Sequence, residues 1–124
     1  MGRPIYVRFD TPKELYDKVY QVVEAARDSG KVRKGTNEVT KLVERGEALF
    51  VVMAEDVAPE EILAHMPLLC EEREVPYAYV PSKQELGVAA GLGKSTASCC
   101  VVDPGKGKSL LKELSAKATE LRGK

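Results

Sequence analysis

Apolar residues recur at helical spacing near the start of the chain. They lie at i, i+4, i+7, i+8 and i+11, on one face of an amphipathic helix: Leu15, Val19, Val22, Val23 and Ala26. The residues before this face predict the start of the helix, with Thr11 as the capping residue and Pro12 at the first helical position. Glu14, three residues after Thr11, would complete a capping box. Ser29-Gly30 predicts the end of the helix.

A second helix and a buried strand are predicted next. The short basic stretch Lys31–Gly35 leads to a helix of about ten residues over Thr36–Arg45, which Gly46 ends. The segment Ala48–Ala54 is a continuous apolar run without polar alternation. Such a run is typical of a central strand that is buried on both faces.

A third helix and a second strand follow the apolar run. Asp56 and Pro59, with two glutamates after the proline, predict the start of the helix. Its apolar face would carry Ile62, Leu63, Met66, Leu69 and Cys70. The segment Val75–Val80 predicts a strand with Pro76 at its first position, where the missing N–H is tolerated.

The last part of the chain continues this alternation of helices and strands. Ser82 predicts the cap of a fourth helix, which runs through Ala90 and stops at Gly91, and Ala97–Asp103 predicts a further strand. After the turn Pro104-Gly105, a final helix would carry one apolar stripe, made of Leu110, Leu114, Ala118 and Leu121. Strands and helices at these short spacings predict an α/β fold, a three-layer α/β/α sandwich with a small mixed central sheet.

Length and composition agree with one such domain over residues 1–124. No repeat, low-complexity segment or linker divides the 124 residues, of which 44% are hydrophobic and 31% charged. The longest apolar run is much shorter than the ~18 residues that a membrane helix needs. Since the start MGRPIYVRFD lacks the apolar region of a secretory signal, we expect a cytoplasmic protein with no membrane partner.

Cysteine and histidine usage argues against a disulfide framework and a metal site. The chain has three cysteines, and Cys99 and Cys100 are adjacent in an apolar segment, which predicts buried, reduced thiols. With His65 as the one histidine and no C-x-x-C motif, there are too few ligands for structural zinc, so we expect no metal and no cofactor. We expect His65 to lie near a buried helix face as a hydrogen-bonded structural residue. Tyr77 and Tyr79, which alternate on their strand, should share a face of the core.

The candidate chemistry lies in the polar cluster Lys31–Lys41. The formal net charge is zero, from 19 basic and 19 acidic residues, so an RNA-binding protein would need to gather its cations in one place. On the predicted helix, Asn37, Glu38 and Lys41 fall within about 100° of one another, away from the apolar side. An amide, a carboxylate and an ammonium group would therefore lie together at a helix N-terminus.

This combination suits an RNA target. Asn offers a donor and an acceptor, Lys donates to guanine O6 and N7, and Glu accepts from exocyclic amines or from guanine N1–H. Backbone N–H groups at the helix start favour phosphate, and Gly35 allows a backbone to come close. The plainer alternative is a solvated helix face on which Glu38 and Lys41 form an i, i+3 pair worth about 0.2–0.5 kcal/mol. Composition alone favours the plainer alternative.

Short motifs add a resemblance to a known family. Lys34–Lys41 together with Val43–Gly46 resembles the signature of the kink-turn-binding ribosomal protein family. That family includes an archaeal large-subunit protein (the L-seven-Ae type) and its eukaryotic relative in the box C/D small nucleolar RNP. Further matches follow in the same order, in Ala54–Asp56, Pro59–Ile62, His65–Glu72, Val75–Tyr77 and Ser82–Gly87. The resemblance covers roughly residues 10 to 103 and is closest to the archaeal member.

The resemblance implies a protein that binds the kink-turn, an RNA bend stabilised by tandem sheared G·A pairs, and that is not an enzyme. The positions that match the readers of those guanines are Asn37, Glu38 and Lys41. The positions that match contacts to the RNA backbone are Lys34, Gly35 and Thr36. Those that match the pocket for a flipped-out nucleotide, and the loop that closes over it, are Ile62, Lys83, Leu92, Gly93, Lys94 and Ser95.

The resemblance also implies cellular roles. These are a place in the large ribosomal subunit, a core position in box C/D and H/ACA small guide RNPs, and a non-catalytic place in archaeal RNase P. The RNA partners would be kink-turns and kink-loops in rRNA, guide RNA and RNase P RNA. The protein partners would be sRNP and ribosomal proteins, and the free protein would be a monomer. Two positions depart from the family pattern. Gly93-Lys94-Ser95 replaces a loop in which many relatives carry proline, and Ala58 replaces an acidic residue of some relatives.

Two other functions remain as alternatives. The segment Gly91–Thr96 ends like a Walker A motif, but the full motif needs glycine at the position of Val88. The predicted order of helix, loop and strand is also the reverse of a phosphate-binding loop. The other alternative is a scaffold of the same fold that binds proteins without kink-turn readout. Such a scaffold would not require Asn37, Glu38 and Lys41.

Overall fold

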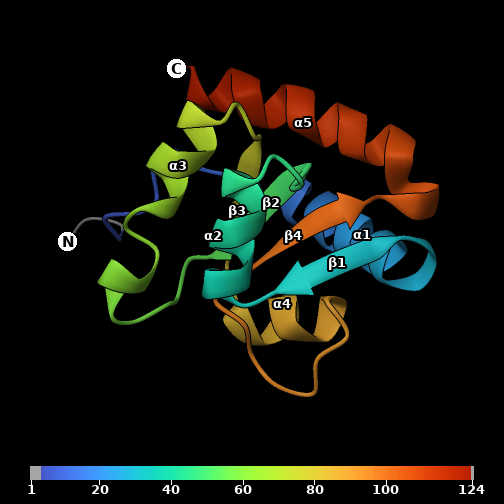
Figure 1. Cartoon of the computed structure of the whole chain (residues 1–124), viewed down its shortest axis with the longest axis horizontal. Helices are drawn as coiled ribbons and strands as arrows, with labels where there is room; N and C mark the ends of the chain where they lie inside the picture. Colours follow the sequence, from blue (N-terminus) through green and yellow to red (C-terminus); the bar gives the residue numbers. More distant parts are fainter. Residues whose placement is uncertain (1–3, 124) are drawn as a thin grey trace.

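In the computed structural model, which describes residues 4–123, a mixed sheet of four strands forms the centre (Figure 1). The strands are β1 (Lys31–Lys34), β2 (Phe50–Ala54), β3 (Tyr77–Val80) and β4 (Ser98–Asp103). Their order across the sheet is β1-β4-β2-β3. Strands β2 and β3 are parallel, while β4 runs antiparallel to both of its neighbours, β1 and β2.

Helices cover both faces of this sheet. They are α1 (Lys13–Ser29), α2 (Thr36–Glu44), α3 (Met66–Glu72), α4 (Lys83–Ala89) and α5 (Lys108–Arg122). The short 3-10 turns η1 (Glu60–Ile62) and η2 (Gly105–Gly107) precede α3 and α5. Helix α1 packs on β1 and β4 and also contacts α4 and α5, whereas α2 covers the same two strands from the opposite side and packs against α3 (Figure 1).

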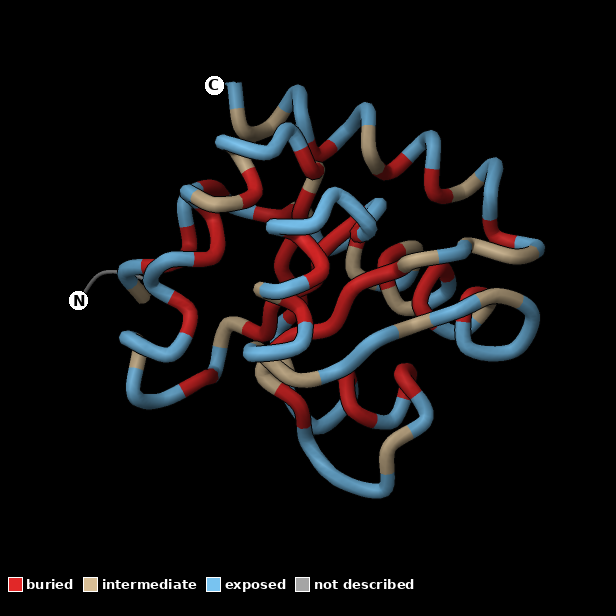
Figure 2. The backbone as a smooth tube through the Cα atoms, in the orientation of Figure 1, coloured by how far each residue is buried: buried red, intermediate tan, exposed pale blue. Residues whose placement is uncertain are grey.

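The burial of β2 confirms the three-layer arrangement. All five residues of β2 are buried (Figure 2). Since successive side chains of a strand point to opposite faces, a strand buried throughout needs cover on both of them. The fold predicted from the sequence is therefore the one that the structure has.

Several local predictions are confirmed. The five residues predicted for the apolar face of α1 are the ones that the structure buries. Helix α2 buries Val39, Leu42 and Val43, opposite to its polar face. The Oγ of Ser82 caps α4 by accepting the N–H of Glu85 at 3.1 Å. The three cysteines are buried and free, and burial raises the pKa of Cys70 and of Cys100 to about 12.

Strand β1 was not predicted. The basic composition of Lys31–Lys34 predicts a connection between two helices, but these residues pair with β4, with Lys34 opposite Cys99. The strand lies at the edge of the sheet, and three of its four side chains are exposed cations. Val32 is its one apolar residue, so β1 shows no alternation of apolar and polar residues that hydrophobic periodicity could detect.

Three helix predictions were wrong in detail. Thr11 does not cap α1, since Pro12 occupies the cap position and the buried Thr11 Oγ1 has no hydrogen-bond partner. Helix α3 begins at Met66 and not near Pro59, because Pro67 fits only the first turn of a helix. In α5 the buried stripe contains Leu111, whereas Leu110 is half-buried; both choices fit a helical period.

His65 and Ile62 are more exposed than the predicted third helix implied. Because η1 and a turn replace its first part, Ile62 keeps 41% of its surface exposed. His65 is exposed as well, and its Nε2 lies 2.9 Å from the Oγ1 of Thr40 on α2. It is a hydrogen-bonded histidine, as predicted, but it joins α2 to α3 at the surface and does not lie on a buried face.

An aromatic cluster anchors the segment that precedes α1. Tyr77 and Tyr79 are buried on one face of β3, as predicted, with their rings 5.9 Å apart and edge to face. Phe9 packs on both rings, and the Tyr79 hydroxyl donates to the carbonyl of Tyr6 at 2.5 Å. The Tyr6 hydroxyl in turn donates to the carbonyl of Ala54 at 2.7 Å and accepts the N–H of Val57 at 3.2 Å. Tyr6 therefore holds the chain where it leaves β2.

We expect the substitution Tyr6→Phe to lower the free energy of unfolding by about 1–3 kcal/mol, because it leaves a buried carbonyl and a buried N–H without their shared partner. Urea denaturation measures this change. The matched control is Tyr16→Phe, since the hydroxyl of the half-buried Tyr16 makes no hydrogen bond with the described residues, and it should cost under about 0.5 kcal/mol. Equal losses in the two variants would contradict the anchoring role of Tyr6.

Candidate RNA interface

The predicted RNA contacts lie along one edge of the sheet, the edge at which strands end or begin and not the outer strand β1. The parallel strands β2 and β3 end side by side there, with Ala54 opposite Val80. Strand β4 begins at the same edge, where Ser98 lies opposite Met53, and β1 ends there beside Cys99. The start of α2, the segment after β2, the start of α4 and the loop before β4 therefore lie together, although they are far apart in the sequence (Figure 1).

The start of α2 is clamped to the first residue of β4. Gly35 caps the helix at a φ of 92°, a conformation that residues with a side chain rarely adopt. Its N–H donates to the carbonyl of Ser98 at 3.2 Å, and the hydroxyls of Thr36 and Ser98 lie 3.1 Å apart. A Cβ on Gly35 would meet nothing within 4 Å, so the space in front of the helix start is open to a ligand. Sequence reasoning missed the role of Ser98.

The predicted polar face of α2 points to solvent. Asn37, Glu38 and Lys41 are all exposed. Among the described residues, neither Glu38 nor Lys41 takes part in an ion pair, so the i, i+3 pair of the plainer alternative is not formed. The amide, the carboxylate and the ammonium group are thus available to a ligand. Together they can donate to and accept from base edges.

The start of α4 is held from two sides. The N–H of Lys83 donates to Oδ1 of Asp56 at 2.9 Å, and the carbonyl of Lys83 accepts the N–H of Thr96 at 3.1 Å. These contacts tie Lys83 to the segment after β2 and to the loop before β4, while its side chain stays exposed. Asp56 belongs to one of the matched motifs, but its backbone contact could not be predicted from spacing.

The loop between α4 and β4 passes directly over α4. The N–H of Leu92 donates to the carbonyl of Gly87 at 2.8 Å, and a Cβ on Gly87 would overlap the carbonyl oxygen of Lys94. Leu92 is half-buried, whereas Gly93, Lys94 and Ser95 are exposed. Gly87 therefore determines the path of the loop, a role that the sequence analysis missed.

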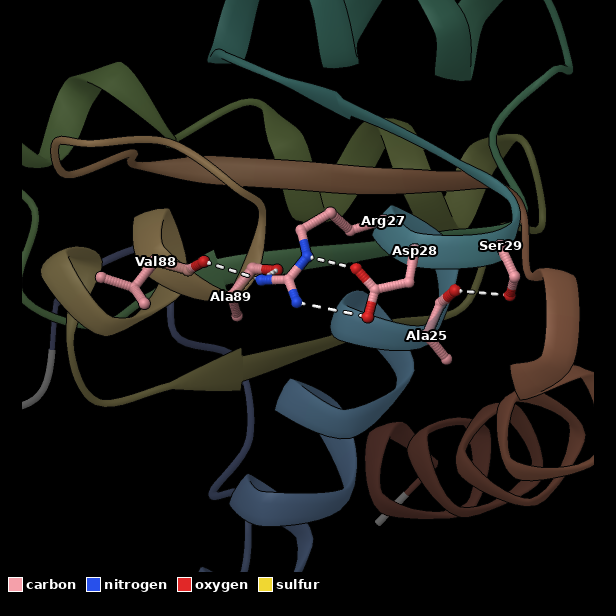
Figure 3. A network of polar contacts seen from close by, with 6 residues as sticks. All are labelled: Ala25, Arg27, Asp28, Ser29, Val88 and Ala89. Atoms are coloured by element: carbon pink, nitrogen blue, oxygen red, sulfur yellow. Dashed lines mark hydrogen bonds and ion pairs between the residues drawn. The ribbon is translucent and has the colours of Figure 1, made fainter.

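A guanidinium group from α1 supports the end of α4 from behind (Figure 3). Nη1 of Arg27 donates to the carbonyls of Val88 at 3.2 Å and Ala89 at 3.3 Å. Its Nε and Nη2 donate to the two carboxylate oxygens of Asp28 at 2.9 and 3.3 Å, and this contact lowers the pKa of Asp28. The last carbonyls of a helix lack partners within the helix, so Arg27 fixes α4 just before the loop begins.

The electrostatic character of this edge suits a polyanion. The exposed cations that the fold brings there are Lys34, Lys41, Lys83 and Lys94. Lysines attract phosphates without regard to base sequence, while Asn37 and Glu38 can read bases. Within residues 4–123, no three histidine, cysteine or acidic side chains are arranged to hold a metal ion. None of the helices described has the length and apolar character needed to cross a membrane.

The Walker-like segment connects a helix to a strand, which is the order of elements that the sequence predicts. Residues Gly91–Thr96 connect helix α4 to strand β4, so the loop precedes a strand and not a helix. A phosphate-binding loop of this type instead directs the backbone N–H groups of a following helix at the phosphates. This context argues against a nucleotide hydrolase.

Comparison with known proteins relates the chain to a family model and to solved structures. The model of the ribosomal protein L7Ae/L30e/S12e/Gadd45 family matches residues 17–111 of the chain. The chain is also similar to the solved structure of the Giardia lamblia 15.5kD RNA binding protein, with 30% sequence identity and a TM-score of 0.87. That likeness covers 97% of this chain and 99% of the other.

We expect Gly87→Ala to lower the free energy of unfolding by about 1–3 kcal/mol, since the added methyl group would force the loop away from α4. Amide hydrogen exchange of residues 92–96 should become faster in the same variant. Gly93→Ala is the matched control, because a Cβ at Gly93 meets nothing within 4 Å, and it should change the stability by under about 0.5 kcal/mol. A loop whose exchange is unchanged in Gly87→Ala would contradict the packing described here.

Proposed function

This chain belongs to the ribosomal protein L7Ae/L30e/S12e/Gadd45 family, and on that premise we propose that it binds RNA at a kink-turn. The binding face would consist of α2, the start of α4 and the loop Leu92–Ser95. The observation that carries the proposal is the exposed set of Asn37 and Glu38 in the first turn of α2 and Lys41 one turn further on, with no ion pair inside the set. The chain itself is not an enzyme.

The three side chains suit the exposed edges of guanines in sheared G·A pairs. Lys41 can donate to guanine O6 or N7, and Glu38 can accept from N1–H or the exocyclic amine. Asn37 can donate and accept at once. Since α2 is clamped through Gly35 and Thr36 to β4, these groups would meet the RNA without a costly rearrangement of the backbone.

The remaining predicted residues would hold the RNA around this readout. Lys34 and the N–H groups at the start of α2 suit phosphates, as do Lys83 and Lys94. Ile62 and Leu92 would offer apolar surface to a flipped-out base, because each keeps part of its surface accessible. Gly93 and Ser95 would let the loop adjust to the RNA.

We further propose that the RNA targets are those of the family's archaeal members. These are rRNA in the large subunit, box C/D and H/ACA guide RNAs, and RNase P RNA, with kink-loops as well as kink-turns among the motifs. The protein would act in the cytoplasm as a monomer that holds a bent RNA. Other proteins of each particle would then dock and supply the catalysis in tRNA processing, RNA modification or ribosome biogenesis.

A gel shift tests the proposal directly. The purified chain should bind a kink-turn RNA much more tightly than the same RNA with its G·A pairs replaced by Watson–Crick pairs. Equal affinity for both RNAs would mean that the chain binds RNA only through its cations. No affinity for either RNA would favour the alternative of a scaffold that binds proteins.

The substitution Lys41→Ala should weaken kink-turn binding by about 1–3 kcal/mol, the range for a specific base contact. It should leave the melting temperature nearly unchanged, since an exposed helix position contributes under about 0.5 kcal/mol to stability. The control is Lys117→Ala, which removes the same charge from an exposed position on α5. Similar losses of affinity in the two variants would show that only net charge matters.

Leu92 and Lys94 should contribute to RNA binding in different ways. Leu92→Ala should cost about 1–2 kcal/mol of affinity at any ionic strength, through lost apolar burial of the flipped-out base. Lys94→Ala should instead reduce the slope of log affinity against log salt by about one phosphate contact or less. A salt titration of both variants with one kink-turn RNA separates the two effects. The assignment is reversed if Leu92→Ala changes the slope and Lys94→Ala does not.

A further inference from the structure

A groove between α1 and α4 lies apart from the exposed face of α2. Its volume is about 510 Å³. Helix α1 contributes Asp17, Tyr20 and Glu24, and α4 contributes Glu85 and Val88. Because α1 and α2 cover opposite faces of the sheet, the groove lies away from Asn37, Glu38 and Lys41 (Figure 1). Its residues on α4 follow directly after Lys83, which belongs to the proposed RNA face.

The charge of the groove is entirely negative. Asp17, Glu24 and Glu85 line it, and no lysine, arginine or histidine does. In the described part of the chain, none of these three carboxylates forms an ion pair.

Two of the three cations of α1 are engaged elsewhere. Lys18 binds Glu113 of α5 at 2.9 Å, and Arg27 is held by Asp28 and by the carbonyls of α4 (Figure 3). Neither of these two cations therefore forms an ion pair with a carboxylate of the groove.

The groove also offers apolar surface between these charges. Val88 leaves 62% of its surface exposed, and the half-buried ring of Tyr20 and the side chain of Ala89 lie beside it. Burial raises the pKa of Tyr20 to about 12, and the negative charge of Glu85 adds to this shift. The Tyr20 hydroxyl thus stays protonated and lies close to that carboxylate. A ligand that fits must combine positive charge with at least one apolar side chain.

The spacing of the acidic side chains suits a short peptide segment. Asp17 and Glu24 are seven residues apart on α1, which separates them by about 10 Å along the helix axis. Glu85 faces them from α4. A nucleic acid would be repelled by these carboxylates, because its backbone carries a negative charge at every phosphate.

We propose that the groove between α1 and α4 binds a segment of another protein that is rich in arginine or lysine and carries an apolar residue. Cations of the segment pair with Asp17, Glu24 and Glu85, and its apolar side chain packs against Val88 and Tyr20. The segment leaves Asn37, Glu38 and Lys41 on α2 open to RNA, while Gln84 and Glu85 of the groove adjoin Lys83 of the proposed RNA face. This inference does not depend on which RNA the α2 face recognises.

The experiment uses the full ¹⁵N-labelled chain and a synthetic peptide of Arg-Arg-Leu repeats. Peptide addition should shift the amide signals of Asp17–Glu24 and Gln84–Ala89, and those of α2 much less. The double variant Asp17→Asn/Glu24→Gln should bind the peptide about fivefold more weakly, as expected for the loss of two exposed ion pairs. The control Glu47→Gln/Glu120→Gln removes the same charge from exposed positions outside the groove and should bind like the wild type.

A second pair of measurements tests the apolar contact. Val88→Ala should weaken binding of the Arg-Arg-Leu peptide but not of an Arg-Arg-Gly peptide of equal charge. Both double variants should keep the wild-type affinity for kink-turn RNA and the wild-type melting temperature. If the wild-type chain does not bind kink-turn RNA, the proposed RNA function is overturned, but the inference about the groove is not affected.

Three results would overturn the inference. The first is an equal loss of peptide affinity in the Glu47→Gln/Glu120→Gln control, which would mean that the peptide binds by net charge alone. The second is a map of kink-turn RNA shifts that covers Asp17–Glu24 on α1, which would make RNA the occupant. The third is self-association of the chain in sedimentation that Asp17→Asn/Glu24→Gln abolishes, which would make a second copy the occupant.

Discussion

The complete burial of β2 is the constraint on which the rest of the structure depends. Each residue from Phe50 to Ala54 is inaccessible to solvent, so helices must cover both faces of the sheet. Helix α1 covers one face and α2 the other. The same strand pairs in parallel with β3 and antiparallel with β4, so two strand ends and one strand start meet at one edge. The candidate RNA interface is built on that edge because the strands bring their connections there.

A set of backbone contacts gives this edge its rigidity. The hydroxyls of Tyr6, Thr36 and Ser98 and the carboxylate of Asp56 bind groups of the main chain or each other. A hydrogen bond of this kind contributes only about 0.5–1.5 kcal/mol, but several of them act on the same short connections. The side chains that these contacts do not use, on the outer face of α2, are the ones offered to a ligand. A preordered face of this kind loses little conformational freedom on binding.

Charge is separated across the molecule although the chain as a whole is neutral. Exposed lysines gather at the sheet edge near α2 and the loop before β4, while uncompensated carboxylates line the groove between α1 and α4. Arg27 connects the two regions, since it binds the carbonyls of Val88 and Ala89, which line the groove and immediately precede the loop in the chain (Figure 3). The two surfaces therefore suit partners of opposite charge, a polyanion at the edge and a basic segment in the groove.

The pattern of apolar and polar residues within a single helix or strand predicts which side of that element is buried. The buried faces of α1 and α2, the buried strand β2 and the Ser82 cap of α4 follow from periodicity and from short-range hydrogen bonding. The orientation of Asn37, Glu38 and Lys41 toward solvent follows in the same way, because the opposite side of α2 is apolar. Their part in reading RNA came from the order of several motifs and stays a prediction.

Features that join distant parts of the chain needed the three-dimensional structure. Strand β1 exists because β4 offers it hydrogen bonds, and nothing in its own basic side chains signals a strand. The close passage of Lys94 over Gly87, the bond from Thr40 to His65 and the groove between α1 and α4 likewise depend on residues that are far apart in the sequence or on neighbouring elements. Periodicity reports which side of an element is buried, but it does not report what packs against that side, and only the packing brings these groups together.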